Sequence, residues 1–193
     1  MDMKYTAKIE KALQTAAILH RDQLRKNTVA IPYITHPFAV ALILSNYTDE
    51  EDVLVAGLLH DTVEDSEYTA DDLGKDFGAN VREIVAGVTE VKDDEKGNKR
   101  PWKIRKEDYI ANLKNDSQGS LLLCAADKIH NMRTMLDEFN LSGPEFLGNF
   151  NCTPEEKHWY HSEILKVLED KLENKEILVD YRRILEESGK MKG

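Results

Sequence analysis

The chain has 193 residues, of which 41% are hydrophobic and 32% charged, and its formal net charge is −10. A chain of this size and apolar content can bury the core of one compact domain. The excess of acidic residues argues against general nucleic-acid binding, which needs a basic face. An anionic substrate would therefore need a local basic patch or a metal ion to attract it.

The sequence also gives no signal for a membrane or a secretory route. The longest apolar run, Phe38 to Leu44, is far shorter than the ~20 residues that span a bilayer. The N-terminus continues into a polar amphipathic pattern, without the apolar core of a signal peptide. Two cysteines, Cys124 and Cys152, provide neither a disulfide framework nor a metal-binding pair. We therefore expect a cytoplasmic protein with no nucleic acid and no membrane among its partners.

Apolar residues at helical spacing dominate the chain, and alternation typical of strands is scarce. In chain order, the expected helices are residues 9 to about 25, 37–44, 50 to about 66, 70–78, 81–88, about 102–113, 120 to about 139, and two more within 153–189. Residues 92–100 and 141–152 are expected to be loops. This pattern predicts an all-α fold.

Several of these helices carry recognisable start signals. Thr69-Ala70-Asp71-Asp72 resembles a capping box, and Thr153-Pro154-Glu155-Glu156 combines a cap, a first-position proline and a box acid. Pro37 is expected to be the first residue of its helix, Asp49 or Thr48 to cap the next, and Gly119 to open the helix from residue 120.

The main chemical signal is an apolar helix that runs into His60-Asp61-Thr62-Val63-Glu64-Asp65. Residues three and four apart share a helix face, so His60 lies above Glu64, and Asp61 above Glu64 and Asp65. Because His60 and Asp61 are ~100° apart around the helix, both can reach one ion beside it. The alternative, a solvated acidic helix end, is disfavoured by the helix dipole. The segment by itself leaves both interpretations open.

The helix from residue 120 adds a second acidic position. An apolar run ends in Asp127, and a buried carboxylate needs a cation or several hydrogen-bond donors. Asn131 and Thr134 fall on the same face at steps of four and three. A salt bridge from Asp127 to a core lysine or arginine is the alternative.

His36 is the third component of the possible metal site. It precedes Pro37, which favours extended backbone at a helix start, and it can serve as a cap, a packing residue or a ligand. Together, His36, His60, Asp61 and Asp127 offer two imidazoles and two carboxylates. This mixed set suits Mn²⁺, Fe²⁺, Zn²⁺ or Co²⁺ better than Ca²⁺ or a thiolate-binding ion.

A His, a His-Asp doublet and a distant Asp, all on helices, resemble the HD superfamily of metal-dependent phosphohydrolases. Four segments in order are similar to the hydrolase domain of the RelA/SpoT alarmone family and to small stand-alone alarmone hydrolases. These segments are His20-Arg21-Asp22-Gln23-Leu24-Arg25-Lys26, Pro32-Tyr33-Ile34-Thr35-His36-Pro37, His60-Asp61-Thr62-Val63-Glu64-Asp65 and Ala126-Asp127-Lys128-Ile129-His130-Asn131-Met132-Arg133-Thr134. The resemblance implies one HD domain over 1–193, with its motifs within 16–135. This domain would be a bundle of about eight to ten helices around a central metal site, completed by the helices in 153–189.

The same resemblance assigns roles to individual residues. His36, His60, Asp61 and Asp127 would bind Mn²⁺, or another divalent transition metal in its place. Glu64 and Asp65 would position or activate the attacking water. The substrate would be a guanosine nucleotide, contacted by Arg25, Lys26, Asn131 and Thr134, and pyrophosphate would leave from the 3′ position of (p)ppGpp.

Two other functions stay open on the sequence alone. One is an HD phosphohydrolase of another nucleotide, such as a deoxynucleotide or NADPH. The other is a catalytically silent HD module that senses nucleotides, although Glu64 and Asp65 beside a full ligand set speak against it.

The remaining polar residues have simpler interpretations. His20 is expected in the core or in contact with a metal ligand, His130 in packing, and Cys124 in the core. His158 and His161 are expected on a surface or in the contact of a homo-oligomer. A basic cluster is expected to be a solvated helix start more than a phosphate-steering patch, and it comprises Lys99, Arg100, Lys103, Arg105 and Lys106.

Overall fold

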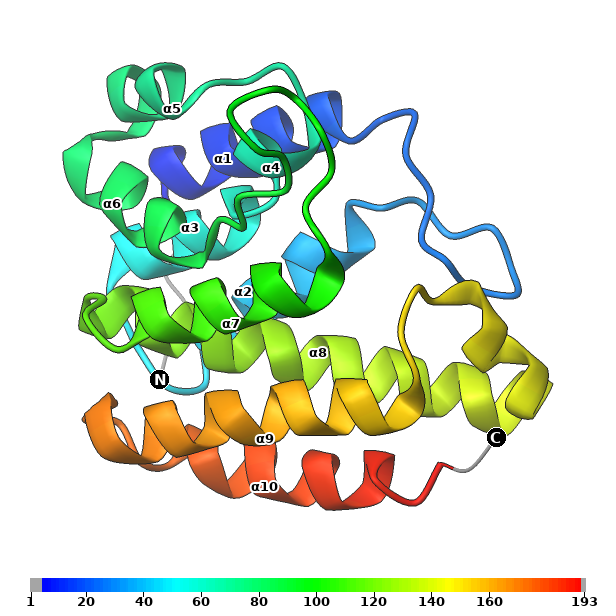
Figure 1. The fold of residues 1–193 in the computed structure, drawn as a ribbon. Coiled ribbons are helices and arrows are strands. Elements are labelled where there is room, and N and C mark those ends of the chain that lie inside the picture. Colours follow the sequence, from blue (N-terminus) through cyan, green and yellow to red (C-terminus); the bar gives the residue numbers. More distant parts are fainter. Residues whose placement is uncertain (1–4, 192–193) are drawn as a thin grey trace.

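The computed structural model describes residues 5–191, and helices make up most of it (Figure 1). In chain order the helices are α1 (Ala7–Leu19), α2 (Thr35–Leu44), α3 (Glu51–Leu59), α4 (Thr62–Asp65), α5 (Ala70–Phe77), α6 (Ala79–Val88), α7 (Trp102–Leu113), α8 (Gln118–Ser142), the 3-10 helix η1 (Pro144–Asn149), α9 (Pro154–Lys171) and α10 (Ile177–Ser188). Within the described residues, β-type pairing is limited to the isolated bridges Leu24 with Pro32 and Asp93 with Lys99. The all-α prediction is confirmed.

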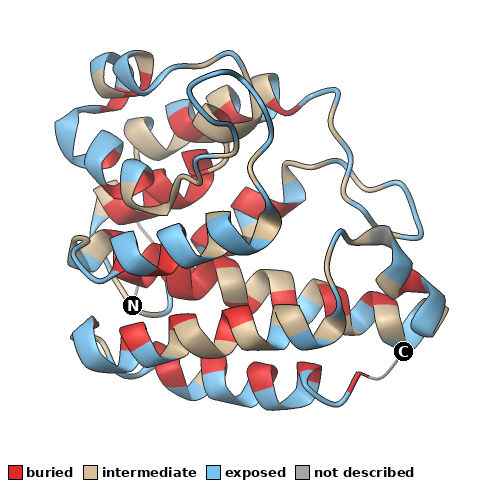
Figure 2. Cartoon of the chain, viewed as in Figure 1, coloured by how far each residue is buried: buried red, intermediate tan, exposed pale blue. Residues whose placement is uncertain are grey.

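Helix α8 is the axis around which the other helices pack. It contacts α2, α3 and α6 as well as α9 and α10 (Figure 1). Residues 120–127 of α8 and residues 53–59 of α3 are all buried, and Figure 2 shows these stretches in the interior. A helix that is buried on every side explains an apolar run without a polar face. The two buried runs end at Asp127 and His60, so polar groups lie at the edge of a rigid core.

The first helix is shorter than the sequence predicted. It ends at Leu19 and not near residue 25, because the chain turns at His20, whose Nδ1 lies 2.8 Å from Gln23 Oε1. Beyond the turn, the backbone N–H of Arg25 donates to Ile31 O at 2.9 Å. This pairing makes the segment an extended loop that returns to the start of α2.

The prediction that Pro37 begins the second helix was wrong. Helix α2 starts at Thr35, so His36 and Pro37 both lie in its first turn, and the extended backbone expected for His36 is not found. The first turn of a helix leaves its N–H groups without intrahelical partners, and a proline is tolerated there. His36 is therefore held on a helix and is completely enclosed, with 1% of its surface exposed.

The third helix was predicted to continue to about Ser66, but it breaks at the motif itself. Helix α3 ends at Leu59, and the chain resumes as the short helix α4 at Thr62. At the break, the Thr62 hydroxyl donates to Leu59 O at 2.6 Å, and His60 Nδ1 lies 2.8 Å from Gly57 O. These side chains satisfy carbonyls at the helix end. His60 and Asp61 consequently occupy a turn.

The helix starts were predicted with mixed success. The capping boxes of Thr69 with Asp72 and of Thr153 with Glu156 are both present. The cap position of α3 is Glu50, without a side-chain cap, in place of Asp49 or Thr48. Helix α8 begins at Gln118, earlier than predicted, because the Ser117 side chain accepts from Ser120 N at 3.1 Å.

Residues 141–152 were expected to be a loop, but they include the end of α8 and all of η1. Over the residues that the structure describes, no helix is long and apolar enough to cross a membrane.

Candidate metal centre and substrate cavity

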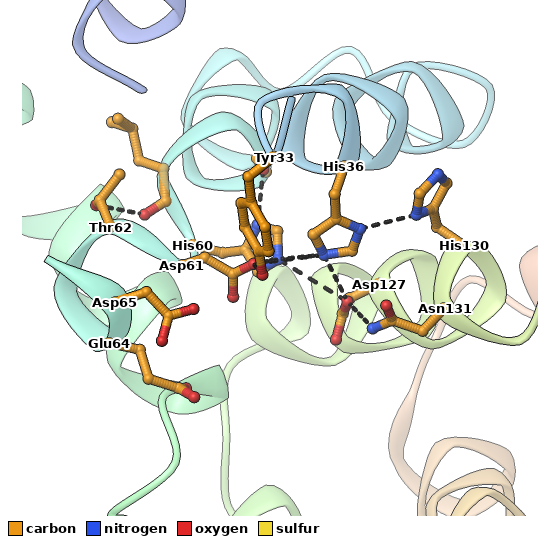
Figure 3. A network of polar contacts seen from close by, with 12 residues as sticks. Tyr33, His36, His60, Asp61, Thr62, Glu64, Asp65, Asp127, His130 and Asn131 are labelled. Carbon is orange, nitrogen blue, oxygen red and sulfur yellow. Dashed lines mark hydrogen bonds and ion pairs between the residues drawn. The ribbon is translucent and has the colours of Figure 1, made fainter. Parts of the chain in front are cut away.

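Four side chains from three parts of the chain meet at one point. His36 comes from α2, His60 and Asp61 from the turn after α3, and Asp127 from α8 (Figure 3). The Nε2 atoms of His36 and His60 are 3.2 Å apart, and His36 Nε2 lies 3.2 Å from Asp127 Oδ1. Asp61 Oδ2 lies 3.4 Å from His36 Nε2 and 3.3 Å from His60 Nε2. The structure therefore brings together all four residues that the sequence suggested as ligands.

The donor set fits a divalent transition metal. The contact of His60 Nδ1 with the carbonyl of Gly57 places the ring proton on Nδ1, which leaves the Nε2 lone pair facing His36 and Asp127. One donor atom each from His36, His60 and Asp127 lies within 4.8 Å of the others. Two imidazoles and two carboxylates with converging lone pairs repel one another unless protons or a cation lie between them. Nitrogen and oxygen donors in this ratio suit Mn²⁺, Fe²⁺, Zn²⁺ and Co²⁺.

A surrounding set of residues orients these four side chains. Tyr33 Oη donates to Asp61 Oδ2 at 2.7 Å, and Asn131 Nδ2 donates to Asp127 Oδ1 at 2.5 Å. Lys128 Nζ lies 2.6 Å from Asp127 Oδ2. Burial by itself would raise the pKa of Asp127, but the charge of Lys128 outweighs it and holds that pKa well below its usual range.

His130 also belongs to this surrounding set. Its Nδ1 lies 2.7 Å from His36 Nδ1, so His130 also contacts a proposed ligand, beyond the packing role expected for it. His130 is three residues after Asp127, and this spacing keeps both on one side of α8. Tyr33 and Lys128 lie within the motifs, but the sequence analysis assigned them no role. The contact of Tyr33 with Asp61 joins residues 28 apart in the chain, whereas Lys128 contacts the adjacent Asp127.

Glu64 and Asp65 lie on α4, directly after the metal centre (Figure 3). Lys92 Nζ contacts both carboxylates, at 2.9 Å from Glu64 Oε1 and 2.6 Å from Asp65 Oδ1. The backbone N–H of Glu90 donates to Glu64 Oε2 at 3.1 Å. Burial raises the pKa of Glu64, and the contacts with Glu90 and Lys92 lower it only in part. The prediction that residues 92–100 form an exposed loop holds for residues 93–99, whereas Lys92 and Arg100 are half-buried.

A cavity of about 470 Å³ lies beside the metal centre. All four residues predicted to contact substrate line it, namely Arg25, Lys26, Asn131 and Thr134, and Asp65 does as well. Arg25 Nη2 donates to Asn131 Oδ1 at 3.3 Å, which ties the loop after α1 to α8. Tyr33, Lys128 and Asn131 line the cavity and also contact metal-centre residues, so the two sites are continuous.

The cavity wall is basic although the whole chain is acidic. Besides Arg25 and Lys26, four lysines line the cavity: Lys92, Lys106, Lys128 and Lys157. The basic cluster predicted near residue 100 divides, since Lys106 faces the cavity while Lys99 and Lys103 are exposed. This wall supplies the local positive patch that an anionic ligand requires.

Three other predictions can be compared with the structure. His161 is buried and lines the cavity, so its expected surface position was wrong, whereas His158 is exposed. The sequence could have suggested this difference, because His161 shares a helix face with the apolar Ile164 and Leu165. His20 and Cys124 are buried, as predicted.

Comparisons with known proteins agree with this geometry. The HD domain family matches residues 12–142. A GTP pyrophosphokinase from Streptomyces coelicolor is 43% identical over 127 residues, which are 66% of this chain and 14% of that longer protein. The human guanosine-3′,5′-bis(diphosphate) 3′-pyrophosphohydrolase MESH1 is 39% identical over 131 residues, 67% of this chain and 70% of that enzyme.

The resemblance extends to a solved structure. A metazoan orthologue of SpoT, described as hydrolysing ppGpp, superposes with a TM-score of 0.78 and 29% sequence identity. That superposition covers 97% of this chain and 99% of the other, so it includes the helices beyond residue 142. This chain belongs to the HD domain family and is related to the MESH1 and SpoT hydrolases.

Proposed function

We propose that this protein is a metal-dependent (p)ppGpp 3′-pyrophosphohydrolase. The observation that carries the proposal is the cluster of two His and two Asp side chains that lies beside a cavity walled by cations. The names of human MESH1 and of the metazoan SpoT orthologue, both ppGpp hydrolases, support the same substrate. The proposal includes one functional domain over residues 1–193 and a cytoplasmic location.

His36, His60, Asp61 and Asp127 would hold the metal, and we propose Mn²⁺ as that ion, with another divalent transition metal able to replace it. When bound, such an ion lowers the pKa of a water molecule towards neutrality and offsets phosphate charge. Tyr33 and His130 fix the orientation of Asp61 and His36 through their hydrogen bonds.

Glu64 is proposed as the general base, and Asp65 as the residue that positions the attacking water. Glu64 is largely enclosed, and its raised pKa brings it closer to the range of a useful base. The water oxygen bonds to the phosphorus attached to the sugar, and Glu64 takes its proton. The bond from that phosphorus to the 3′ oxygen breaks, and the 3′ oxygen takes up a proton. Pyrophosphate and a 5′-phosphorylated guanosine are the products.

The substrate contacts follow from the residues that line the cavity. Arg25 and Lys26 line the cavity and carry no carboxylate partner among the described residues, so their charges are available for phosphate oxygens. Asn131 and Thr134 lie on the face of α8 that continues from Asp127 and would contact the nucleoside.

The test is a substrate panel with purified protein and Mn²⁺. We expect pyrophosphate from ppGpp and pppGpp, measured by anion-exchange chromatography, and much slower turnover of deoxynucleoside monophosphates and NADPH. Glu64→Gln should lower kcat by at least about a hundredfold, as expected for the loss of a general base. Glu67→Gln is a matched control, because Glu67 is exposed on the same segment. The absence of pyrophosphate from ppGpp would overturn the proposal.

A further inference from the structure

One wall of the cavity carries three lysines around a single tyrosine. Lys106 comes from α7, Lys128 from α8, and Lys157 and Tyr160 from α9, and all four line the cavity. Lys106 Nζ lies 4.8 Å and Lys128 Nζ 5.8 Å from the centre of the Tyr160 ring. We refer to these four residues as the lysine wall. It stands apart in sequence from Arg25 and Lys26, which approach the cavity on the loop after α1.

The positive charge of the lysine wall exceeds that of its carboxylate partners. Lys106 pairs with Glu90, but Glu90 also pairs with Arg105. Lys128 pairs with Asp127, which is itself directed at the metal centre. In the described part of the chain, no carboxylate lies within ion-pair distance of Lys157. The three lysines are therefore paired with only two carboxylates, and each of these carboxylates also has another cation to neutralise.

Lys157 is held in place without a counter-charge. Its Nζ lies 3.7 Å from the centre of the Phe150 ring, a cation–π contact that fixes the ammonium group against the cavity rim. Burial lowers the pKa of Lys157, and the charges of Lys106, Lys26 and Lys128 lower it further. An anion placed between these lysines would relieve that repulsion.

Two buried polar atoms in the same wall point to a ligand. Among the described residues, Tyr160 Oη and His161 Nδ1 have no hydrogen-bond partner, although both side chains are more than nine-tenths buried and line the cavity. A buried polar atom without a partner costs free energy, and native structures contain few of them. A phosphoryl oxygen can accept from the Tyr160 hydroxyl and from the lysine ammonium groups together.

We propose that the lysine wall is a second anion subsite, which binds the phosphate groups of the nucleotide that are not cleaved. On the proposed function, these groups are the 5′-diphosphate of the guanosine nucleotide, and this identification rests on that function. Lys157 is then a specificity-determining residue, since it favours nucleotides phosphorylated at both ends over those phosphorylated at the 3′ end alone.

The direct test is the binding of GDP, which carries the 5′-diphosphate and no 3′ phosphate. Calorimetry with the metal-loaded protein should show that Lys157→Gln raises the Kd for GDP roughly ten- to hundredfold, since charged hydrogen bonds contribute in this range. Lys166→Gln should leave the Kd within twofold. It is a matched control, because Lys166 lies on the same helix and its side chain is exposed and paired with Glu163.

Kinetics provides a second readout. Lys157→Gln should raise KM for ppGpp with little change in kcat, and should leave the KM of guanosine 3′-diphosphate unchanged. If Lys157→Gln does not fold, as judged by its melting curve, Tyr160→Phe replaces it and should weaken GDP binding several-fold. A Kd for GDP that stays within twofold of wild type in a folded variant overturns the subsite.

Failure of the subsite and failure of the proposed function give different results. GDP binding that depends on Lys157, without any release of pyrophosphate from ppGpp, would keep the subsite and remove the alarmone hydrolase. Hydrolysis of ppGpp with an unchanged KM in Lys157→Gln would keep the alarmone hydrolase and remove the subsite.

Discussion

Lys92 places its ammonium group 2.9 Å from Glu64 Oε1, so a residue from the loop after α6 sets the electrostatics of the proposed general base. The same nitrogen lies 2.6 Å from Asp65 Oδ1. One cation therefore lies against two neighbouring carboxylates. The loop at residues 92–100 therefore contributes to the site through its first residue.

Replacing Lys92 with methionine should move the acid limb of the pH–rate profile to higher pH. Burial raises the pKa of Glu64 and Lys92 lowers it, so the variant should have a still higher pKa at Glu64. A general base works when it is deprotonated, so activity would be lost at a higher pH as the solution is acidified. We expect the acid limb of the kcat/KM profile to move to higher pH by roughly one unit.

The control for this prediction is Lys96→Met, in an exposed position of the same loop. It should keep the wild-type profile. An acid limb that stays in place in Lys92→Met would show that Glu64 is not the group whose titration limits the rate.

The metal centre makes a prediction about stability as well as activity. A cation that binds the folded chain alone stabilises it by about 2.7 kcal/mol when its concentration is 100 times its Kd. Mn²⁺ should therefore raise the melting temperature of the wild type, and EDTA should reverse this rise and abolish turnover. His60→Asn should melt at the same temperature with and without Mn²⁺, because it removes a central ligand.

His158→Asn is the matched control for His60→Asn, since His158 is exposed on α9. It should retain the full stabilisation by Mn²⁺. Equal Mn²⁺ stabilisation in His60→Asn and wild type would place the ion elsewhere.

Local sequence patterns were sufficient to identify the proposed metal ligands. The apolar runs before His60 and before Asp127 are buried on all sides, and this burial positions the polar residue at the end of each run. The spacing of Asp127 and Asn131 correctly placed them on one face of α8, where they are hydrogen-bonded. Such features depend on helical periodicity, which the sequence carries directly.

Long-range contacts explain what the sequence could not provide. The sequence pattern favours one continuous helix to about Ser66, and the break at Leu59 depends on the contacts of His60 and Thr62 with nearby carbonyls. The roles of Tyr33 and Lys92 depend on contacts made 28 and 27 residues away along the chain, with Asp61 and Asp65. No periodic pattern specifies such pairs.

Tyr33→Phe should weaken metal binding without abolishing it. The variant loses the hydrogen bond of 2.7 Å from Tyr33 Oη to Asp61 Oδ2 and keeps the aromatic ring. Loss of a group that orients a metal ligand commonly lowers metal affinity ten- to a hundredfold. A titration of activity against Mn²⁺ should show this increase in the half-saturating concentration, with activity restored at high Mn²⁺.

The control for Tyr33→Phe is Tyr47→Phe, whose hydroxyl bonds to Asp180, a residue of α10. It should keep the wild-type Mn²⁺ dependence. Half-saturation at the same Mn²⁺ concentration in Tyr33→Phe and wild type would show that the Tyr33 hydroxyl does not orient Asp61 for binding.

His161 should make the folded state less stable in mild acid. Burial lowers its pKa from the usual 6.5 to about 3, and the charges of Lys128 and Lys157 add to this lowering. Between these two values the unfolded chain binds a proton that the folded chain does not, so stability falls as the pH falls below about 6.5. From pH 6.5 to 5.5, this residue should cost about 1 kcal/mol of unfolding free energy.

Urea denaturation at both pH values should show that His161→Gln loses about 1 kcal/mol less than wild type, while His158→Gln loses as much as wild type. An equal loss in wild type and His161→Gln would mean that His161 is protonated in the folded protein.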